Sequence, residues 1–201
     1  MKRMVIGLVG PIASGKGEVA KYLRDLGFTV LSLSDRVREE VSARGLPLSR
    51  ENLQNVGNDL REIFGGHVLA ERTLELLGST DGNVVIDSIR NPSEIEFLRH
   101  VLGITVIGID ASPELRMEWY LDRAWRRGED GTSDADFVRA NNRDLGLGEN
   151  NFGQQVVRCL EMADVVIQNE DTKKHLLEAV DYYLISELGF SPEGTRRSKE
   201  K

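Results

Sequence analysis

The sequence predicts an α/β fold in which a five-stranded parallel sheet carries helices on both faces. Five apolar, β-branched runs recur along the 201 residues, and they are largely continuous in apolarity. Continuous runs are typical of strands that are buried on both faces. Helical patterns separate successive runs, as in a doubly wound sheet. A glycine-rich turn follows the first run directly and leads into a helix, which indicates a strand–loop–helix unit at the start of the sheet.

The expected elements follow in chain order. Strands are expected at 4–9, 28–33, 83–87, 104–109 and 164–168. Helices are expected at 18–26, 35–44, 50–64, 67–77, 93–101, 113–127, 134–145, 154–163 and 173–188. In the first helix Val19, Ala20, Leu23 and Leu26 lie on one face, and Gly27 suits its C-cap.

The length suggests one domain over 1–190, followed by a charged tail at 191–201 that is expected to be disordered. The stretch 34–80 is longer than one crossover requires, so it is expected to form a helical insertion. A second helical region, 123–150, carries the features of a lid.

Composition excludes several classes of function. The net charge of -7 argues against a general nucleic-acid-binding surface. Cys159 is the single cysteine, so neither an internal disulfide nor a thiolate zinc cluster can form. The first apolar run is short and continues into a glycine loop, which favours a core strand over a signal peptide or a membrane span. We expect a cytoplasmic protein without membrane or nucleic-acid partners. The sequence does not indicate an oligomeric state.

The glycine-rich turn reads Gly-Pro-Ile-Ala-Ser-Gly-Lys-Gly over residues 10–17. In this context the loop amides and the helix N-terminus form a cradle for polyphosphate, and Lys16 reaches the β- and γ-phosphates. A plain turn between strand and helix is the alternative. Gly17 stands where a Ser or Thr usually holds Mg²⁺. The residues expected to bind the nucleotide are Gly10, Ala13, Ser14, Gly15, Lys16, Gly17 and Glu18.

Ligands of doubly wound sheets bind beyond the carboxyl ends of the strands, so the residues there are candidates for chemistry. Asp87 ends the third strand, where a carboxylate can hold Mg²⁺ or orient its waters; a helix N-cap is the alternative. Ser88 follows it, whereas hydrolytic motors usually place a glutamate there. Asn169 and Thr172 follow the last strand and are expected on the nucleotide side.

Arginines accompany two of these strand ends. Arg38 lies in the first turn of a helix that Ser34 or Asp35 can cap, where a cation is unfavourable unless it contacts an anion. Arg90 can bind a phosphate in a bidentate manner, or it can form a surface ion pair with Glu94.

A second group of arginines lies on the expected lid. Arg123, Arg126 and Arg127 share one helix, at spacings where like charges repel unless a polyphosphate neutralises them. Gly128 and Gly131 follow and supply hinge freedom. The next helix repeats the pattern with Arg139 and Arg143. A basic solvated face is the alternative interpretation.

These motifs resemble the adenylate kinases. In that family glycine commonly follows the P-loop lysine, and Mg²⁺ relies largely on water and phosphate ligands. The segment Leu31–Arg38 is similar to the one that opens the nucleoside-monophosphate subdomain, which implies that Arg38 grips the acceptor's phosphate. Asp87–Arg90 resembles the family's Asp-x-x-x-Arg, although the spacing is one residue shorter. Arg123 and Arg127 hold lid-like positions.

Over roughly 1–190 the chain also resembles a mainly archaeal group of adenylate-kinase-like and dephospho-coenzyme-A-kinase-like P-loop proteins. The resemblance rests on Gly15–Ala20, on Asn52–Gln54 with Gly57–Arg61, on Asp87–Glu94 and on Phe152–Val156. The segment around Gln154 has no counterpart in ordinary adenylate kinases, and its polar side chains are candidates for reading a base or positioning the second substrate.

The leading hypothesis is therefore a kinase that transfers the γ-phosphoryl group of ATP–Mg²⁺ to a nucleoside or deoxynucleoside monophosphate. Lys16, Asp87, Arg123 and Arg127 are the expected catalytic residues, with Asp87 as the metal ligand. The residues expected to bind this small phosphorylated acceptor are Asp35, Arg38, Arg61, Arg90, Arg143 and Gln154. Two alternatives remain: dephospho-coenzyme A as the acceptor, and a nucleotide-binding regulatory module with weak ATPase activity.

Overall fold

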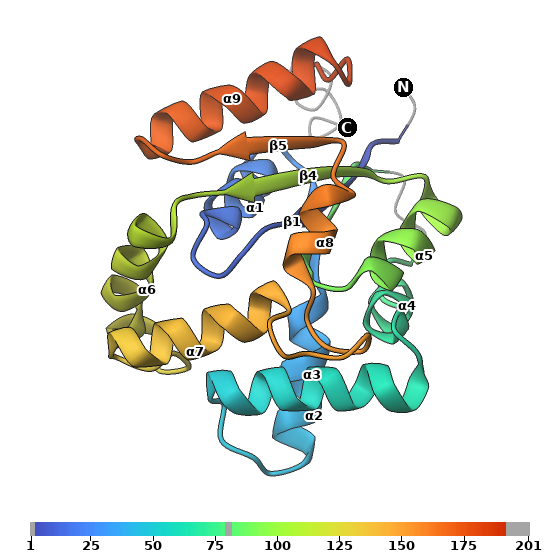
Figure 1. The fold of residues 1–201 in the computed structure, drawn as a ribbon. Coiled ribbons are helices and arrows are strands. Elements are labelled where there is room, and N and C mark those ends of the chain that lie inside the picture. The colour runs from blue at the N-terminus through green and yellow to red at the C-terminus, as the bar shows by residue number, and fades with distance from the viewer. Residues whose placement is uncertain (1–2, 79–81, 192–201) are drawn as a thin grey trace.

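The computed structural model describes residues 3–78 and 82–191, with the side chains of Trp125 and Arg127 excepted. Five strands form one sheet in the order β2-β3-β1-β4-β5, and every neighbouring pair is parallel. The strands are β1 (Val5–Val9), β2 (Thr29–Ser32), β3 (Val84–Ile89), β4 (Thr105–Asp110) and β5 (Val165–Gln168). The predicted α/β fold with a five-stranded parallel sheet is confirmed (Figure 1).

The helices alternate with the strands as the sequence predicts, and most boundaries differ by one or two residues. The described helices are α1 (Lys16–Asp25), α2 (Leu33–Ala43), α3 (Arg50–Phe64), α4 (Val68–Leu74), α5 (Pro92–Leu102), α6 (Pro113–Arg127), α7 (Asp134–Leu145), α8 (Val156–Glu161) and α9 (Lys173–Ser186). The fourth and eighth are shorter than expected. Residues 154 and 155 precede α8 without regular secondary structure.

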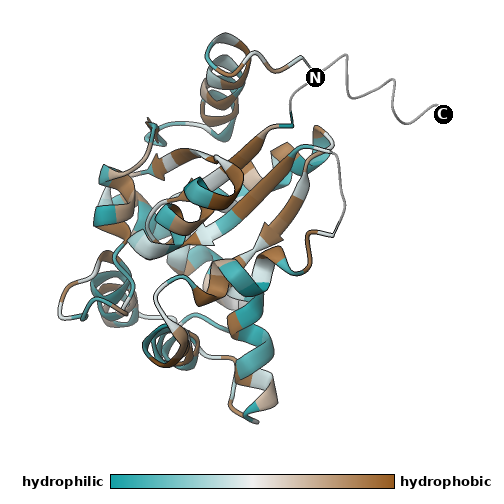
Figure 2. Cartoon of the chain, turned by 90° about the vertical axis from the view of Figure 1, so that its right-hand side faces the viewer, coloured by the Kyte–Doolittle hydropathy of each residue, from teal (hydrophilic) through white to brown (hydrophobic). Residues whose placement is uncertain are grey.

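Two apolar layers cover the sheet, one on each face. Alternate residues of β1 enter different layers: Val5 and Val9 pack with α2 to α5, whereas Ile6 and Leu8 pack with α1 and α9. Figure 2 shows the hydrophobic strands between helices whose outward faces are largely hydrophilic. Burial on both faces explains why the strands read as continuous apolar runs.

The pairing of β1 with β3 contains an irregularity beside the glycine-rich turn. Gly7 pairs with Ile86, but Val9 pairs with Ile89, so β3 has one extra residue between these pairs. Ser88 lies in this bulge with a φ of 66°, an unusual value for a residue with a side chain. A bulge changes the direction in which side chains point, and this one sets the orientation of Asp87 and Ser88 next to β1.

The segment between β2 and β3 folds into α2, α3 and α4, which pack on one another and on α5. In Figure 1, α3 lies across the bottom of the view, next to α2 and α7. The proposed division into an insertion and a lid stays a prediction, and most of the expected tail lies outside the described residues. Among the described helices, none combines the length and apolarity that crossing a membrane requires.

Candidate active site

The loop between β1 and α1 is built on two glycines that no other residue could replace without rearrangement. Gly10 has a φ of +147°, and an added Cβ would lie 2.0 Å from the Ile109 carbonyl oxygen on β4. Gly15 has a φ of +98°, and its Cβ would lie 2.5 Å from Asn169 Nδ2. Asn169 donates from that nitrogen to the Ser14 carbonyl, at 3.0 Å. The end of β5 therefore fixes the start of α1, whose first N–H groups have no carbonyl partners within the helix.

Lys16 is buried at the centre of this loop. Its Nζ donates to the carbonyls of Gly10, at 2.5 Å, and Pro11, at 2.8 Å. Burial, reinforced by the positive charge of Arg90, lowers the pKa of Lys16 from 10.5 to about 7; Asp144 and Asp87 oppose this effect. The ammonium form is therefore only marginally favoured near neutral pH, and an anionic ligand would stabilise it.

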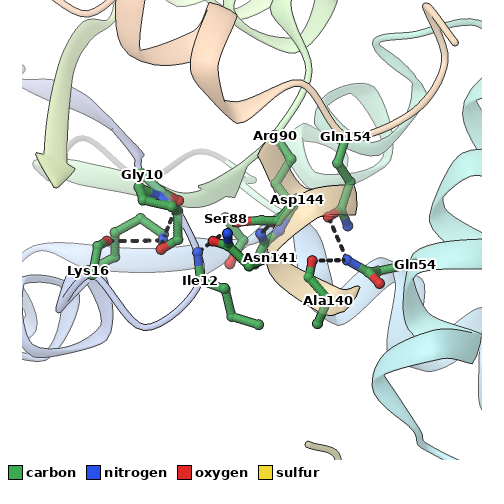
Figure 3. Close-up of polar contacts among 12 residues, drawn as sticks. Gly10, Ile12, Lys16, Gln54, Ser88, Arg90, Ala140, Asn141, Asp144 and Gln154 are labelled. Carbon is green, nitrogen blue, oxygen red and sulfur yellow. Dashed lines mark hydrogen bonds and ion pairs between the residues drawn. The ribbon is translucent and has the colours of Figure 1, made fainter. Parts of the chain in front are cut away.

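A group of buried polar side chains from α6 and α7 supports the loop from behind (Figure 3). Asp144 accepts a hydrogen bond of 2.7 Å from the Ile12 amide and also pairs with Arg90. Arg116 donates to the Ala111 carbonyl and, at 2.5 Å, to the Asn141 side chain. Asp144 thus ties the loop after β1 to the strand end that carries Arg90.

Asp87 has the properties of a magnesium ligand. It lies inside β3 at the bulge, and Asn91 instead caps α5, so the N-cap alternative for Asp87 is wrong. Its Oδ1 is buried without a hydrogen-bond partner in the described structure, and its charge reaches Lys16. No group of three or more potential protein ligands exists among the described residues. Mg²⁺ commonly binds through one or two carboxylates together with phosphates and water. The unpaired Oδ1 of Asp87 therefore fits the role of a protein ligand to Mg²⁺.

One cavity of about 850 Å³ runs across the carboxyl ends of the strands. At one end lie the P-loop and the β5–α9 connection with Asn169, Asp171 and Lys173. At the other end lie α2, α3 and Gln154. Its lining contains six arginines: Arg38, Arg50, Arg61, Arg90, Arg123 and Arg126. Such a concentration of guanidinium groups suits ligands with more than one phosphate.

Three of these arginines are held by two carboxylates at the turn after α6. Arg38 donates to both carboxylate oxygens of Glu129, at 2.9 and 3.1 Å. Arg50 and Arg123 both donate to Asp130, at 2.7 to 3.0 Å. The hydrogen bonds between Arg38 and Glu129 raise the pKa of Arg38 and lower that of Glu129. The turn therefore binds α2 and α3 through guanidinium groups that line the cavity.

The far end of the cavity is lined by Arg61 of α3, which pairs with a buried carboxylate of α5. Arg61 donates from Nε to Glu94, at 2.8 Å, and both side chains are almost completely buried. Glu94 also accepts from the backbone N–H groups of Arg90 and Asn91. The sequence-based alternative for Arg90, an ion pair with Glu94, is therefore wrong, because only the Arg90 backbone meets Glu94 whereas its side chain binds Asp144.

The structure brings most of the predicted site residues to the cavity. Those that line it are Ala13, Ser14, Gly15, Lys16, Gly17, Glu18, Arg38, Arg61, Asp87, Arg90, Arg123, Gln154 and Asn169. Gly10 lies just behind the lining, where its carbonyl binds Lys16. The Arg127 side chain lies outside the described residues.

Three predicted residues lie away from the cavity lining. Asp35 is exposed and pairs with Arg38, and Thr172 caps α9 by accepting from the His175 amide. Arg143 donates to Glu149 and to Asn55 of α3.

Sequence reasoning missed Asp144, Asn141 and Arg116. The buried face of α7 consists of Phe137, Ala140, Asn141 and Asp144. Two of these are polar and fall on the same 3.6-residue stripe as the apolar ones. Polar residues at helix positions that face the core were the sequence signal for this group of buried polar side chains.

Comparison with known proteins places the chain among P-loop proteins. Residues 9–137 match a family model described as an AAA domain. The chain is 34% identical over 168 residues to a UPF0200 protein of Methanoculleus marisnigri, covering 83% of this chain and 87% of that one. A UPF0200 protein of Pyrococcus horikoshii is also 34% identical, over 177 residues, covering 84% and 89%. The chain belongs to the UPF0200 family.

Solved structures extend the likeness of this UPF0200 chain to kinases at the level of the fold. A Thermus thermophilus protein has a TM-score of 0.58 and 21% identity, covering 93% of this chain and 99% of its own. The shikimate kinase of Acinetobacter baumannii, solved in complex with shikimate, has a TM-score of 0.54 and 17% identity, covering 92% and 96%. The chain has the P-loop kinase-like fold.

The environment of Lys16 makes a prediction about pH and stability. Because the pKa of Lys16 is 10.5 when exposed and about 7 in the folded protein, the unfolded chain binds more protons between these values. The free energy of unfolding should therefore rise with pH in this window. Lys16→Met removes this dependence, so it should stabilise the protein most at pH 7 and progressively less toward pH 10, as measured by urea unfolding.

Lys21→Met is the matched control, because Lys21 is exposed on the same helix. The difference in the free energy of unfolding between Lys21→Met and wild type should not vary with pH. If the difference between Lys16→Met and wild type is also independent of pH, the burial of a destabilising charge at Lys16 is contradicted.

Proposed function

We propose that this chain transfers the γ-phosphoryl group of ATP to a nucleoside or deoxynucleoside monophosphate. The observation that carries the proposal is the single cavity that joins the P-loop to an arginine-lined pocket between α2 and α3. A P-loop alone would suit any nucleotide-binding protein. A cavity that continues from the P-loop into a region lined by cations suits a reaction between two phosphorylated ligands.

The arginines indicate a phosphorylated acceptor. A phosphate monoester that is already ionised needs no general base to attack the γ-phosphorus, but it needs cations to overcome repulsion between two polyanions. Arg38, Arg50 and Arg123 supply such cations around one space. An uncharged alcohol acceptor would not require them.

The reaction moves one phosphoryl group between two phosphates. A bond forms between an oxygen of the acceptor's phosphate and the γ-phosphorus, and the bond between the γ-phosphorus and the β–γ bridging oxygen breaks. ADP leaves with the electron pair of that bond, and the acceptor becomes a diphosphate. Lys16 would neutralise charge on the β- and γ-phosphates, and Arg90 and Arg123 would stabilise charge on the transferring group.

Magnesium would be held by Asp87 on the protein side. When bound, the ion would neutralise charge on the phosphates of ATP. The Asp87 carboxylate would fix the position of these phosphates relative to Lys16. The neighbouring Ser88 hydroxyl donates to Asp87, at 3.2 Å, and accepts from Ser32, at 3.1 Å, which orients the carboxylate from the second strand end.

A coupled assay of ADP formation tests the proposal directly. The panel consists of AMP, GMP, CMP, UMP, their deoxy forms, dTMP and dephospho-coenzyme A, each with ATP and Mg²⁺. We expect ADP formation that depends on one of the monophosphates and that Lys16→Met abolishes, with the fold checked by circular dichroism. Dependence on dephospho-coenzyme A would reassign the acceptor. Slow ADP formation without any acceptor, or full turnover by Lys16→Met, would contradict a kinase.

Glu129 provides a second test, because it forms an ion pair with the Arg38 guanidinium that the acceptor's phosphate would need. Glu129→Gln removes the charge and one of two accepting oxygens, so the acceptor should displace it more easily. We expect the KM for the acceptor to fall roughly three- to tenfold. The effect is modest because the ion pair of Arg38 and Glu129 is partly exposed to solvent. Glu39→Gln is the control, since Glu39 forms an exposed surface pair with Arg36. A higher KM would mean that Glu129 assists acceptor binding.

A further inference from the structure

The acceptor end of the cavity contains a buried arginine with an unused donor. Arg61 is 2% exposed, and its Nε is paired with Glu94, which is 0% exposed. Its Nη1 is buried and has no hydrogen-bond partner in the described structure. Leaving a buried donor of a charged group unpaired is unfavourable, so this position calls for a ligand atom that accepts a hydrogen bond.

Gly57 leaves space beside this donor. It lies one turn before Arg61 on α3 and lines the same cavity. An added Cβ at Gly57 would lie 3.6 Å from Arg61 Nη1 and 3.6 Å from a Val37 methyl group. A ligand atom placed there would therefore be within a few tenths of an ångström of hydrogen-bonding distance. Glycine is a poor residue for the middle of a helix, and room for a ligand gives it a reason to be there.

A second donor follows from the pairing of two glutamines. Gln54 donates from Nε2 to the Ala140 carbonyl, at 3.0 Å, which fixes the orientation of its amide. The same nitrogen donates to Gln154 Oε1, at 3.1 Å. The Gln154 oxygen must therefore face Gln54, as Figure 3 shows, and its Nε2 is left as a donor. Gln154 lines the cavity at this end.

The charge balance decides what kind of acceptor atom fits. The side chains of Arg61 and Glu94 are almost completely buried, whereas those of Arg38 and Glu129 are partly exposed. Glu94 already neutralises the charge of Arg61, so an anion would add an unbalanced charge to a buried place. A neutral carbonyl oxygen satisfies the donor without adding charge. Leu33, Val37, Leu53 and Leu69 also line the cavity and supply apolar walls for a flat ring.

On the basis of the proposed function, we propose that Gly57, Arg61 and Gln154 form a subsite for the base of the acceptor, and that they select a ring bearing carbonyl oxygens. Uracil, thymine and guanine present such oxygens. Adenine carries no carbonyl and places an amino group, itself a donor, against the donors of this subsite. The selection is thus by matching of donors with acceptors, and Gly57 admits the ring edge to Arg61.

The test measures binding by titration calorimetry, independently of turnover. The probes are UMP, dTMP, GMP and AMP, with a non-hydrolysable ATP analogue as a reference ligand for the P-loop. Wild type should bind at least one carbonyl-bearing nucleotide more than tenfold tighter than AMP. Gly57→Ala should weaken that binding at least tenfold and leave the affinity for the ATP analogue unchanged.

The same variant separates a binding role from a structural one. Because the added methyl group meets its neighbours at ordinary contact distance, Gly57→Ala should leave the thermal unfolding midpoint unchanged or raise it. Glu62→Ala, an exposed change on the same helix, should alter neither the midpoint by much nor any affinity. Gln154→Glu replaces the donor with an acceptor while it keeps an oxygen facing Gln54, and it should erase the preference over AMP.

Several results would overturn the inference. These are equal affinity for AMP and the carbonyl-bearing nucleotides, undiminished binding of UMP, dTMP and GMP by Gly57→Ala, and no binding of any of the four. Failure of the kinase proposal looks different. A chain that binds UMP selectively but forms no ADP keeps the subsite and loses the kinase, whereas acceptor-dependent ADP formation without this selectivity keeps the kinase and loses the subsite.

Discussion

The compensation of positive charge around one cavity is the constraint on which the rest of this structure depends. Six arginines and Lys16 of the described residues line the same space, and carboxylates pair with the arginines. Asp144 holds Arg90, Glu129 holds Arg38, and Asp130 holds Arg50 and Arg123. Asp144 and Asp130 are almost completely buried, where an unpaired charge would be costly. The network therefore connects the P-loop, α2, α3 and the turn after α6 through ionic contacts and hydrogen bonds.

Positive charge that is removed from water is stabilised in two different ways around the cavity. The arginines have carboxylate partners, whereas Lys16 has no carboxylate within hydrogen-bonding distance among the described residues and its pKa falls to about 7. A polyphosphate at the loop would supply the missing anion to Lys16. An acceptor's phosphate would compete with Glu129 for Arg38. Binding of both substrates would thus exchange internal ion pairs for ion pairs with phosphate, and the turn that carries Glu129 and Asp130 would respond to the acceptor.

The sequence carries most of the information about the sheet and the donor end of the cavity. Continuous apolar runs and the Gly-x-x-x-x-Gly-Lys pattern depend on local spacing, so they can be recognised without any contact map. Strand-end geometry also places Asp87, Arg38 and Arg90 at one edge of the sheet. The predicted helix over 154–163 is shorter in the structure, and Gln154 lies before its first residue, where it pairs with Gln54.

The remaining features depend on contacts between distant residues. Ile12 meets Asp144 across 132 residues, and Arg38 meets Glu129 across 91. The bulge at Ser88 arises from a register shift between β1 and β3, which no pattern in either strand indicates. Arg143 has the same spacing pattern as the other arginines that were predicted on a lid, yet it binds Glu149 and Asn55 and does not line the cavity. Spacing along a helix cannot say which of several arginines faces the site.

The protonation of Lys16 on ligand binding tests the central claim most directly. At pH 8 a lysine with a pKa of about 7 is mostly neutral, and a polyphosphate beside it would raise the pKa and draw in a proton. Calorimetric titration with a non-hydrolysable ATP analogue and Mg²⁺, in two buffers of different ionisation enthalpy, measures this uptake. The account predicts uptake of roughly one proton by wild type and none by Lys16→Arg, whose side chain stays charged. Binding without proton uptake, or equal uptake by both proteins, would contradict it.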